Sequence, residues 1–223
     1  MWDNNNELVN LPHSLKSIEF TGSDYTIPST LPSNLECIKI RSYKCILPET
    51  LPQSIKYIEL PFSYKHKLPE NIPMSLEKIN LPFNYNEEFP KSFKKLTELK
   101  RIKWRSNHPL PKNLPDCIET IKFDYNFNQK LSKKLPKNLK RLHFGKSYNQ
   151  TLPKKLPESL QHLVFGNDYC QRIPDMLPKS LKTITINQKK SKEIFENYKI
   201  IGCGLWKENK KLNVKINFIK TDE

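Results

Sequence analysis

The chain has 223 residues, of which 36% are hydrophobic and 27% charged, so it is long and apolar enough for one folded domain or one repeat array. Its 18 prolines argue against a helical bundle, because proline lacks a backbone donor and clashes with the preceding helical turn. The net charge of +15 suits nucleic acid, anionic membranes or acidic proteins as partners, although a Lys-rich solvated surface gives the same count.

The beginning of the chain and its cysteines indicate a compartment. Residues 1–10 are polar and lack the apolar core of a secretory signal. The chain contains no run of 18 apolar residues, which is the length that could span a membrane. The cysteines form no C-x-x-C pair and lack the spacing of zinc ligands, which is typical of reduced thiols. We therefore expect an intracellular, cytoplasmic protein without a metal centre. The five cysteines are Cys37, Cys45, Cys117, Cys170 and Cys203.

One phrase recurs along the chain. It consists of Leu-Pro, two residues of which the second is usually Ser or Asn, an aliphatic residue, two polar residues and an apolar-x-apolar triplet. A degenerate copy begins at Lys95, and the period of about 21 residues lies within the leucine-rich-repeat range. The sequence therefore predicts a β-rich, leucine-rich-repeat-like solenoid of nine coils over residues 11–186. The clear copies begin at Leu11, Leu31, Leu51, Ile72, Leu114, Leu135, Leu156 and Leu177.

The alternation at the end of each phrase predicts a strand. In residues 139–144, Leu142 and Phe144 point to one side and Arg141 and His143 to the other. Stacked coils would form a parallel sheet on one face and bury two ladders of apolar side chains. The first ladder is Ile18, Ile38, Ile58, Ile79, Ile102, Ile121, Leu142, Leu163 and Ile184. The second is Phe20, Ile40, Leu60, Leu81, Trp104, Phe123, Phe144, Phe165 and Ile186.

The segments between strands predict the return side of each coil. About ten residues must close a coil, and their prolines favour loop or short 3-10 turns over a full helix. An aromatic residue followed by Asn or Gln recurs after the strand, as in Phe127-Asn128-Gln129 and Tyr148-Asn149-Gln150. We expect the aromatics to stack between coils and the Asn side chains to bond backbone groups of the turns.

The two ends differ from the repeats. Residues 1–10 are predicted to be a short N-terminal cap, in which Trp2 and Leu8 could cover the first coil. Residues 187–223 have lost the Leu-Pro phrase and are predicted to be a C-terminal cap with a helix at about 189–201 and a strand at about 212–219. Such caps are expected because a bare solenoid end pairs with other chains.

The phrase from Leu156 through Gly166, Asn167 and Asp168 to Pro174 closely resembles the FNIP repeat, as does the segment from Leu135 to Pro153. The resemblance covers about residues 8–186 and implies a leucine-rich-repeat-like solenoid from amoebae or the giant viruses that infect them. Relatives often carry an F-box and recruit substrates to ubiquitin ligases. The first phrase begins at Leu11 and leaves no room for an F-box, so we disfavour that role here.

No motif of an enzyme is present, and we predict no catalytic residue and no cofactor. The sequence has no G-x-S-x-G, H-E-x-x-H or P-loop pattern. His143 and His162 face outward on adjacent strands and could hold a metal, but no third ligand accompanies them. Two exposed strand histidines are the favoured interpretation, so no metal site is predicted.

The outward strand residues are the candidate binding site. The net charge is −1 over residues 1–71, +12 over 72–186 and +4 over 187–223, so basic residues gather on the central coils. We predict a monomeric, non-catalytic scaffold that binds a protein, such as an acidic segment, through its open sheet face. Nucleic acid or another polyanion is the alternative partner, although the stripe has few aromatics for base stacking. The predicted stripe is Lys78, Arg101, Lys103, Lys122, Arg141 and His143, and Arg101 and Arg141 are its best candidates for gripping carboxylates.

Overall fold

The computed structural model describes residues 11–21, 27–41, 45–83, 85–187, 194–195, 199–201, 204–207 and 210–219. Contacts within the chain group it into two compact units. Unit 1 comprises Met1–Ser106 and Asn113–Cys117, and unit 2 comprises Asn107–Lys112 and Ile118–Glu223. The N-terminal cap predicted over residues 1–10 lies outside the described residues.

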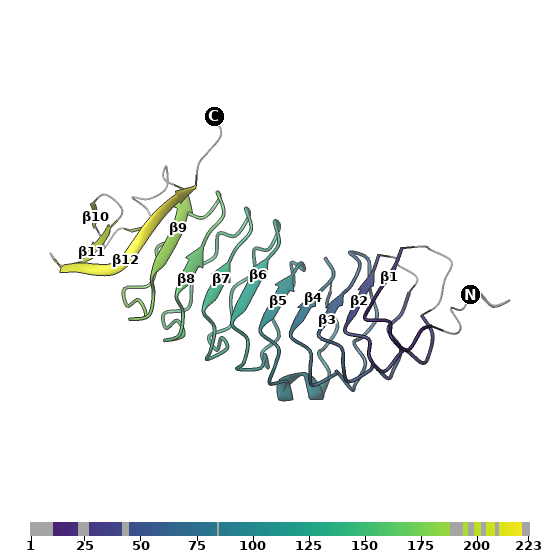
Figure 1. Ribbon diagram of the computed structural model, residues 1–223. Coiled ribbons are helices and arrows are strands. Elements are labelled where there is room, and N and C mark those ends of the chain that lie inside the picture. The colour runs from purple at the N-terminus through teal and green to yellow at the C-terminus, as the bar shows by residue number, and fades with distance from the viewer. Residues whose placement is uncertain are drawn as a thin grey trace. The chain divides into compact units, whose positions relative to one another are not determined.

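Unit 1 contains parallel strands that pair in chain order (Figure 1). Ile38 pairs with Ile18 and with Ile58, and Ile79 pairs with Ile58 and with Ile102, so equivalent residues of the repeat lie side by side. The period of the sequence thus sets the register of the sheet. The strands are β1 (Ser17–Phe20), β2 (Cys37–Ile40), β3 (Tyr57–Glu59), β4 (Lys78–Asn80) and β5 (Arg101–Trp104).

Unit 2 continues the same pattern with a constant offset. β6 (Thr120–Phe123), β7 (Arg141–His143), β8 (His162–Val164) and β9 (Thr183–Asn187) are parallel, and Ile121, Leu142, Leu163 and Ile184 are in register. The nine predicted coils therefore supply β1 to β9, one strand each, and the predicted fold class is confirmed.

Both predicted ladders form the core. In the first ladder every side chain after Ile18 is at most 1% exposed, and in the second ladder every side chain is at most 3% exposed. Ile18 is only half-buried, because β1 has a described neighbour on one side alone. The aliphatic residue of the phrase supplies a third ladder, which is equally buried: Leu35, Ile55, Leu76, Leu99, Ile118, Leu139, Leu160 and Leu181.

The Leu-Pro phrase forms a tight turn that leads into each strand. In the coil of β8, the amide of Leu160 donates to the carbonyl of Pro157 at 3.0 Å, and the same bond recurs in other coils. The Ser159 hydroxyl donates to the carbonyls of Lys137 and Leu139 in the preceding coil, at 2.6 and 2.8 Å. This contact explains the preference for Ser in the phrase, since the hydroxyl satisfies carbonyl groups that the turn leaves unpaired.

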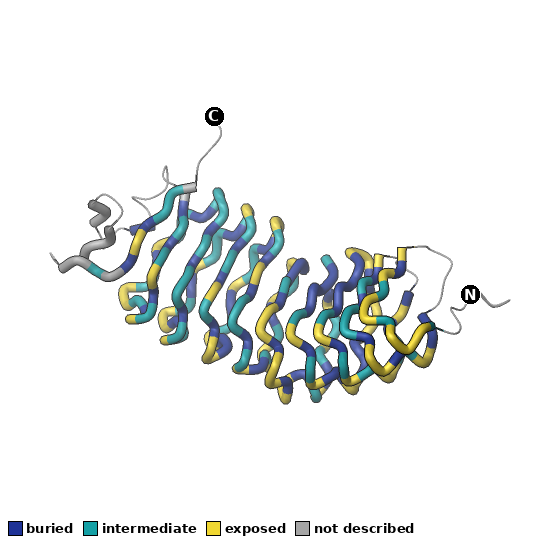
Figure 2. Tube along the Cα trace, in the orientation of Figure 1, coloured by how far each residue is buried: buried dark blue, intermediate teal, exposed yellow. Residues whose placement is uncertain are grey.

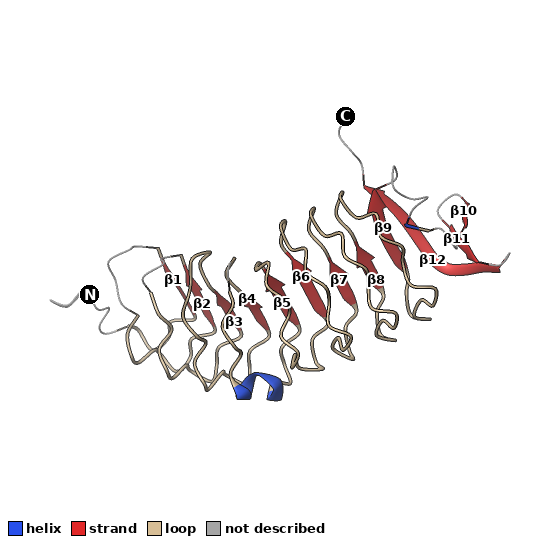
Figure 3. Ribbon diagram, turned by 180° about the vertical axis from the view of Figure 1, so that it is seen from behind, coloured by secondary structure: helices blue, strands red, loops and turns tan. Residues whose placement is uncertain are grey.

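Over the described residues of unit 1 the return side is loop, as predicted, with one 3-10 helix (Figure 3). The helix η1 (Lys91–Lys95) follows Pro90 and buries Phe93. It lies in the coil between β4 and β5, where the register advances by 23 residues from Ile79 to Ile102. The additional residues of this coil thus form a short helical turn.

Aromatic and asparagine ladders run through unit 2. Phe144 stacks on Phe123 and Phe165 at 5.2 and 5.4 Å, and Tyr148 stacks on Phe127 and Tyr169 at 5.9 and 6.0 Å. The Asn128 Oδ1 accepts the amide of Asn149, and the Asn149 Oδ1 accepts the amide of Cys170, at 2.9 and 3.0 Å. Both predicted roles, stacking and backbone bonding, are confirmed in this unit.

The C-terminal segment corrects one prediction. β12 (Lys210–Ile219) contains the predicted strand 212–219 and pairs in parallel with β9, while β11 (Gly204–Lys207) and β10 (Lys199–Ile201) follow in antiparallel order. The helix predicted at 189–201 is therefore wrong over 199–201, because pairing with β11 outweighs the helical spacing. Ile194 is helical, and residues 189–193 and 196–198 lie outside the description. Among the described residues, no helix has the length and apolar character to cross a bilayer.

Candidate partner-binding face of the sheet

The outward strand positions of unit 1 form two columns across β1 to β5. Neighbours within a column are paired in the register of the sheet. The second column carries two carboxylates as well as lysines, so its charges are mixed. The first column is Ser17, Cys37, Tyr57, Lys78 and Arg101, and the second is Glu19, Lys39, Glu59, Asn80 and Lys103.

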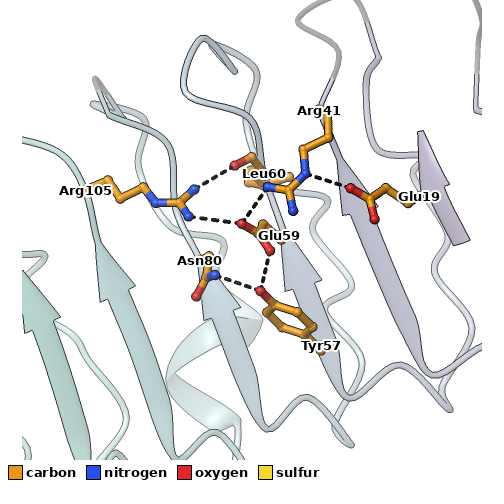
Figure 4. A network of polar contacts seen from close by, with 7 residues as sticks. All are labelled: Glu19, Arg41, Tyr57, Glu59, Leu60, Asn80 and Arg105. Atoms are coloured by element: carbon orange, nitrogen blue, oxygen red, sulfur yellow. Dashed lines mark hydrogen bonds and ion pairs between the residues drawn. The ribbon is translucent and has the colours of Figure 1, made fainter. Parts of the chain in front are cut away.

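A polar cluster occupies this face (Figure 4). The Glu59 carboxylate accepts bonds from Arg41 at 2.9 Å, from Arg105 at 3.0 Å and from the Tyr57 hydroxyl at 2.5 Å. Arg41 also donates to Glu19 at 2.8 Å. Two arginines are thus compensated by two carboxylates. We call this set the Glu59 cluster: Glu19, Arg41, Tyr57, Glu59, Asn80 and Arg105.

Prolines explain why Arg105 reaches across two coils. The amide of Arg41, directly after β2, donates to the carbonyl of Phe20 in the preceding coil. The equivalent residue after β4 is Pro82, which has no N–H for the carbonyl of Leu60. The Arg105 Nη1 donates to that carbonyl at 3.3 Å. The guanidinium therefore satisfies a backbone acceptor that a proline left unpaired.

The surroundings of Glu59 keep it ionised. Burial alone would raise the pKa of its carboxyl, but the bonds from Tyr57, Arg105 and Arg41 outweigh burial and lower the pKa to about 2. Burial and the adjacent carboxylate raise the pKa of the Tyr57 hydroxyl, which therefore stays protonated and donates. The Glu59 side chain is 9% exposed and that of Arg105 is 8% exposed, so this ion pair is part of the folded structure and not a free contact site.

The three predicted stripe residues of unit 1 have different surroundings. The Lys78 Nζ lies 4.4 Å from the centre of the Tyr57 ring, a cation–π contact that holds the ammonium over the face. Arg101, its neighbour in the register, is exposed. Lys103 is half-buried and pairs with Asn80.

The outward face of unit 2 has a different charge. Its two columns contain no carboxylate in the strands β6 to β9 and β12, over the described residues. Figure 2 shows the strands alternating between buried residues and residues that are partly or fully exposed. Lys122 and Arg141 are exposed, so their charges meet solvent. The columns are Thr120, Arg141, His162, Thr183 and Lys215, and Lys122, His143, Val164, Thr185 and Asn217.

The two histidines of this face are held in the neutral form. Burial, then Lys122, lowers the pKa of His143, while burial, then Arg141 and Lys182, lowers the pKa of His162. The His162 Nδ1 lies 2.9 Å from the Thr183 hydroxyl, which orients the ring. Within the described ranges, no group of three or more His, Cys, Asp or Glu side chains could hold a metal.

Sequence reasoning missed two features of unit 1. The Glu59 cluster depends on which backbone carbonyl lacks a donor, and the repeat pattern alone does not show this. The sequence did contain a signal: Pro61 and Pro82 occupy the repeat position that Arg41 and Arg105 occupy in neighbouring coils. A shallow apolar hollow is lined by Phe62, Ser63, Tyr64, Lys65 and Phe83. Phe62 is 61% exposed there and lies under the Arg105 guanidinium at 5.1 Å.

Known proteins support the identification of the repeat. The FNIP repeat family matches three times, over residues 107–147, 127–154 and 148–189. CroV588, a circular LRR protein from a giant virus, has a similar crystal structure with a TM-score of 0.59 and 26% identity, and the match covers 81% of this chain. The chain spans 32% of the length of CroV588.

A second solved structure is less similar. YopM from Yersinia enterocolitica aligns over 82% of this chain and 53% of its own, at 17% identity and a TM-score of 0.32. No curated protein matches the sequence. The three repeat matches, the stacked parallel coils and the likeness to CroV588 agree with one another: residues 107–189 consist of FNIP repeats, and the chain has a leucine-rich-repeat-like fold.

Proposed function

We propose that the chain is a non-catalytic scaffold that binds an acidic protein segment on the outward face of its sheet. One observation carries the proposal: in unit 2 this face presents Lys122 and Arg141 with no carboxylate in the strand columns beside them. Solenoids generally bind partners on such open faces. A carboxylate-rich segment supplies the charge that the face lacks.

The chemistry of the side chains favours carboxylates. Arginine donates two parallel bonds to one carboxylate, which a point-charged lysine does not. Arg141 has Thr120 on one side and His162 on the other, so its guanidinium meets no competing acid within its column. Lys122 lies beside the neutral His143 in the second column and extends the basic surface. The stacked aromatic rings beneath hold these strands in a fixed spacing.

Unit 1 offers a smaller version of the same surface. Arg101 is exposed, and Lys78 beside it is held over Tyr57. Lys103 completes the set proposed for this unit. Because the Glu59 cluster engages Arg41 and Arg105 with carboxylates, those two arginines are not assigned to partner binding.

The test is a titration with a fluorescein-labelled peptide rich in Glu and Asp, followed by anisotropy. The variant Lys122→Glu/Arg141→Glu should bind the peptide at least about 10-fold more weakly, since two attractive contacts become repulsive. A matched control is Lys65→Glu/Lys67→Glu, which changes two exposed lysines of unit 1 by the same charge. Equal binding by the wild type and the Lys122/Arg141 variant would contradict the proposal, as would an equal loss in the control.

A further inference from the structure

We propose that the return loops of unit 2 form a second binding surface, which takes the phosphodiester backbone of single-stranded nucleic acid. This surface lies on the loops and not on the strands, so it is separate from the proposed peptide site. It consists of five exposed lysines at two adjacent positions of consecutive loops, which we call the lysine row: Lys112, Lys133, Lys134, Lys154 and Lys155.

The coils fix the position of these lysines. Before them, the amide of Asn128 donates to Asn107 and that of Asn149 donates to Asn128, each 21 residues apart. After them, the Ser159 hydroxyl bonds the preceding coil at the carbonyl of Leu139. Equivalent loop residues therefore stack at roughly the strand spacing of 4.8 Å.

The flanking leucines turn the lysines outward. Leu131 and Leu135 are 8% and 7% exposed on either side of Lys133 and Lys134, and Leu152 and Leu156 are 8% and 2% exposed around Lys154 and Lys155. The two lysines between each leucine pair are exposed and lie outside the core. Their ammonium groups consequently project from the loops in a row that is two side chains wide.

The fold does not require lysine at these positions. In three coils of unit 1 the equivalent pairs are neutral or acidic, and in the coil of β9 the pair is Asp175 and Met176, whereas the loop before β5 carries the exposed Lys91, Lys94 and Lys95. A repeat that accepts serine, threonine, glutamate, asparagine and aspartate there has no structural need for a run of lysines. The three neutral or acidic pairs of unit 1 are Ser29-Thr30, Glu49-Thr50 and Glu70-Asn71.

The lysines repel one another and lack internal counter-charges. Within the described residues none of the five forms an ion pair. The exposed residue that follows Leu-Pro in successive coils alternates in charge, as Lys137, Glu158 and Lys179. Two unit charges at 4 Å repel by about 1 kcal/mol even in water. A bound polyanion would relieve this repulsion and release its own counterions.

The shape and chemistry of the row favour a nucleic acid strand over the other anionic partners. The row is narrow and follows the stacking direction, which suits a linear anion better than the plane of a membrane. Lysine binds phosphate oxygens as a point charge without a fixed geometry, which suits the flexible backbone of a single strand. The row contains no aromatic side chain for base stacking, so binding should be independent of base sequence.

The experiment uses the full chain and a fluorescein-labelled oligothymidylate. With about five phosphate contacts, affinity should fall about 100-fold between 50 and 200 mM salt. The variant Lys133→Glu/Lys154→Glu should bind at least about 10-fold more weakly at low salt and show a shallower salt slope. The control Lys65→Glu/Lys67→Glu, with the same change in net charge, should keep most of the affinity.

Three outcomes would overturn the inference. The first is an equal loss of oligothymidylate affinity in the control, and the second is no loss in the Lys133/Lys154 variant. The third is that the protein binds phosphatidylserine vesicles through the lysine row but does not bind oligothymidylate. The acidic peptide provides the cross-check, because the Lys133/Lys154 variant should still bind it. Failure of the peptide titration would remove the proposed function and leave the lysine row standing, and the reverse also holds.

Discussion

The two units use the same repeat in different ways. In unit 2 the register advances by a constant 21 residues from Ile121 to Ile184, and aromatic and asparagine ladders run through successive coils. In unit 1 the advance varies from 20 to 23 residues, and Pro82 leaves the carbonyl of Leu60 without a backbone donor. Arg105 crosses two coils to supply that donor.

This difference teaches how regularity affects a surface. Where each coil satisfies the backbone of its neighbour, the outward side chains are left for a partner, as with Lys122 and Arg141. Where the backbone bonding is interrupted, charged side chains of the outward face form buried contacts with one another, as Arg105 and Glu59 do. Variants in either unit therefore test the two halves of this comparison.

Replacement of Glu59 by alanine should destabilise unit 1 by about 3–5 kcal/mol, because it leaves the buried Arg105 without its counter-charge. Hydrogen exchange of the β2 to β5 amides measures the loss within that unit. The exposed carboxylate of Glu36, which pairs with Lys16 and Lys56, provides the control. Glu36→Ala should change exchange very little, and a similar loss in both variants would refute a special role for Glu59.

Acidification should weaken unit 1 before unit 2. The pKa of Glu59 is about 2 in the folded protein against 4.5 for a free carboxyl, so its stabilisation is complete above pH 4.5 and is lost as pH falls towards 2. A shift of this size corresponds to about 3 kcal/mol. Protection factors, which correct each exchange rate for its intrinsic pH dependence, should fall more between pH 5 and pH 2 in the wild type than in Glu59→Gln, and parallel curves would contradict the assignment.

Gly145→Ala should destabilise unit 2 by about 1–3 kcal/mol, the usual cost of overpacking. A methyl group at this position would overlap the backbone carbonyl of Asp124 in the preceding coil, and backbone cannot move aside without breaking the ladder. Thr151→Ala, at an exposed position in the following loop, is the matched control. Urea denaturation compares the two, and an undisturbed midpoint for Gly145→Ala would show that the coils are less closely stacked.

The smallest effect is expected from Tyr148→Phe. The buried Tyr148 hydroxyl has no hydrogen-bond partner among the residues that the structure describes, and Phe127 fills the equivalent position one coil earlier. Removal of the unsatisfied hydroxyl should leave the free energy of unfolding unchanged or increase it by about 1 kcal/mol. If urea denaturation shows that Tyr148→Phe is clearly less stable than the wild type, this hydroxyl forms a hydrogen bond in solution.

The fold was largely predictable because the repeat encodes it locally. Ile79 and Leu142 stand at the same place in the phrase, so a single alternation fixed the strands, the register and both core ladders. The helix predicted at 189–201 failed at β10, because the apolar spacing of that segment also suits a strand and pairing with β11 decides between them.

The binding residues could be predicted only in part. Outward positions follow from the alternation, so the exposed Arg101 and Arg141 were found. Their electrostatic surroundings depend on side chains from other coils. The engagement of Arg41 with Glu59, and the contact of Lys78 with Tyr57, require the three-dimensional register.

The most direct test of the account is zero-length coupling of the Glu- and Asp-rich peptide to lysine amines, with the modified residues identified by mass spectrometry. This chemistry joins a carboxylate only to an amine that it already touches. We expect coupling at Lys122 on the outward face of unit 2, and excess oligothymidylate should leave the yield of this coupling unchanged. Coupling confined to Lys133, Lys134, Lys154 and Lys155, with Lys122 unmodified, would contradict it.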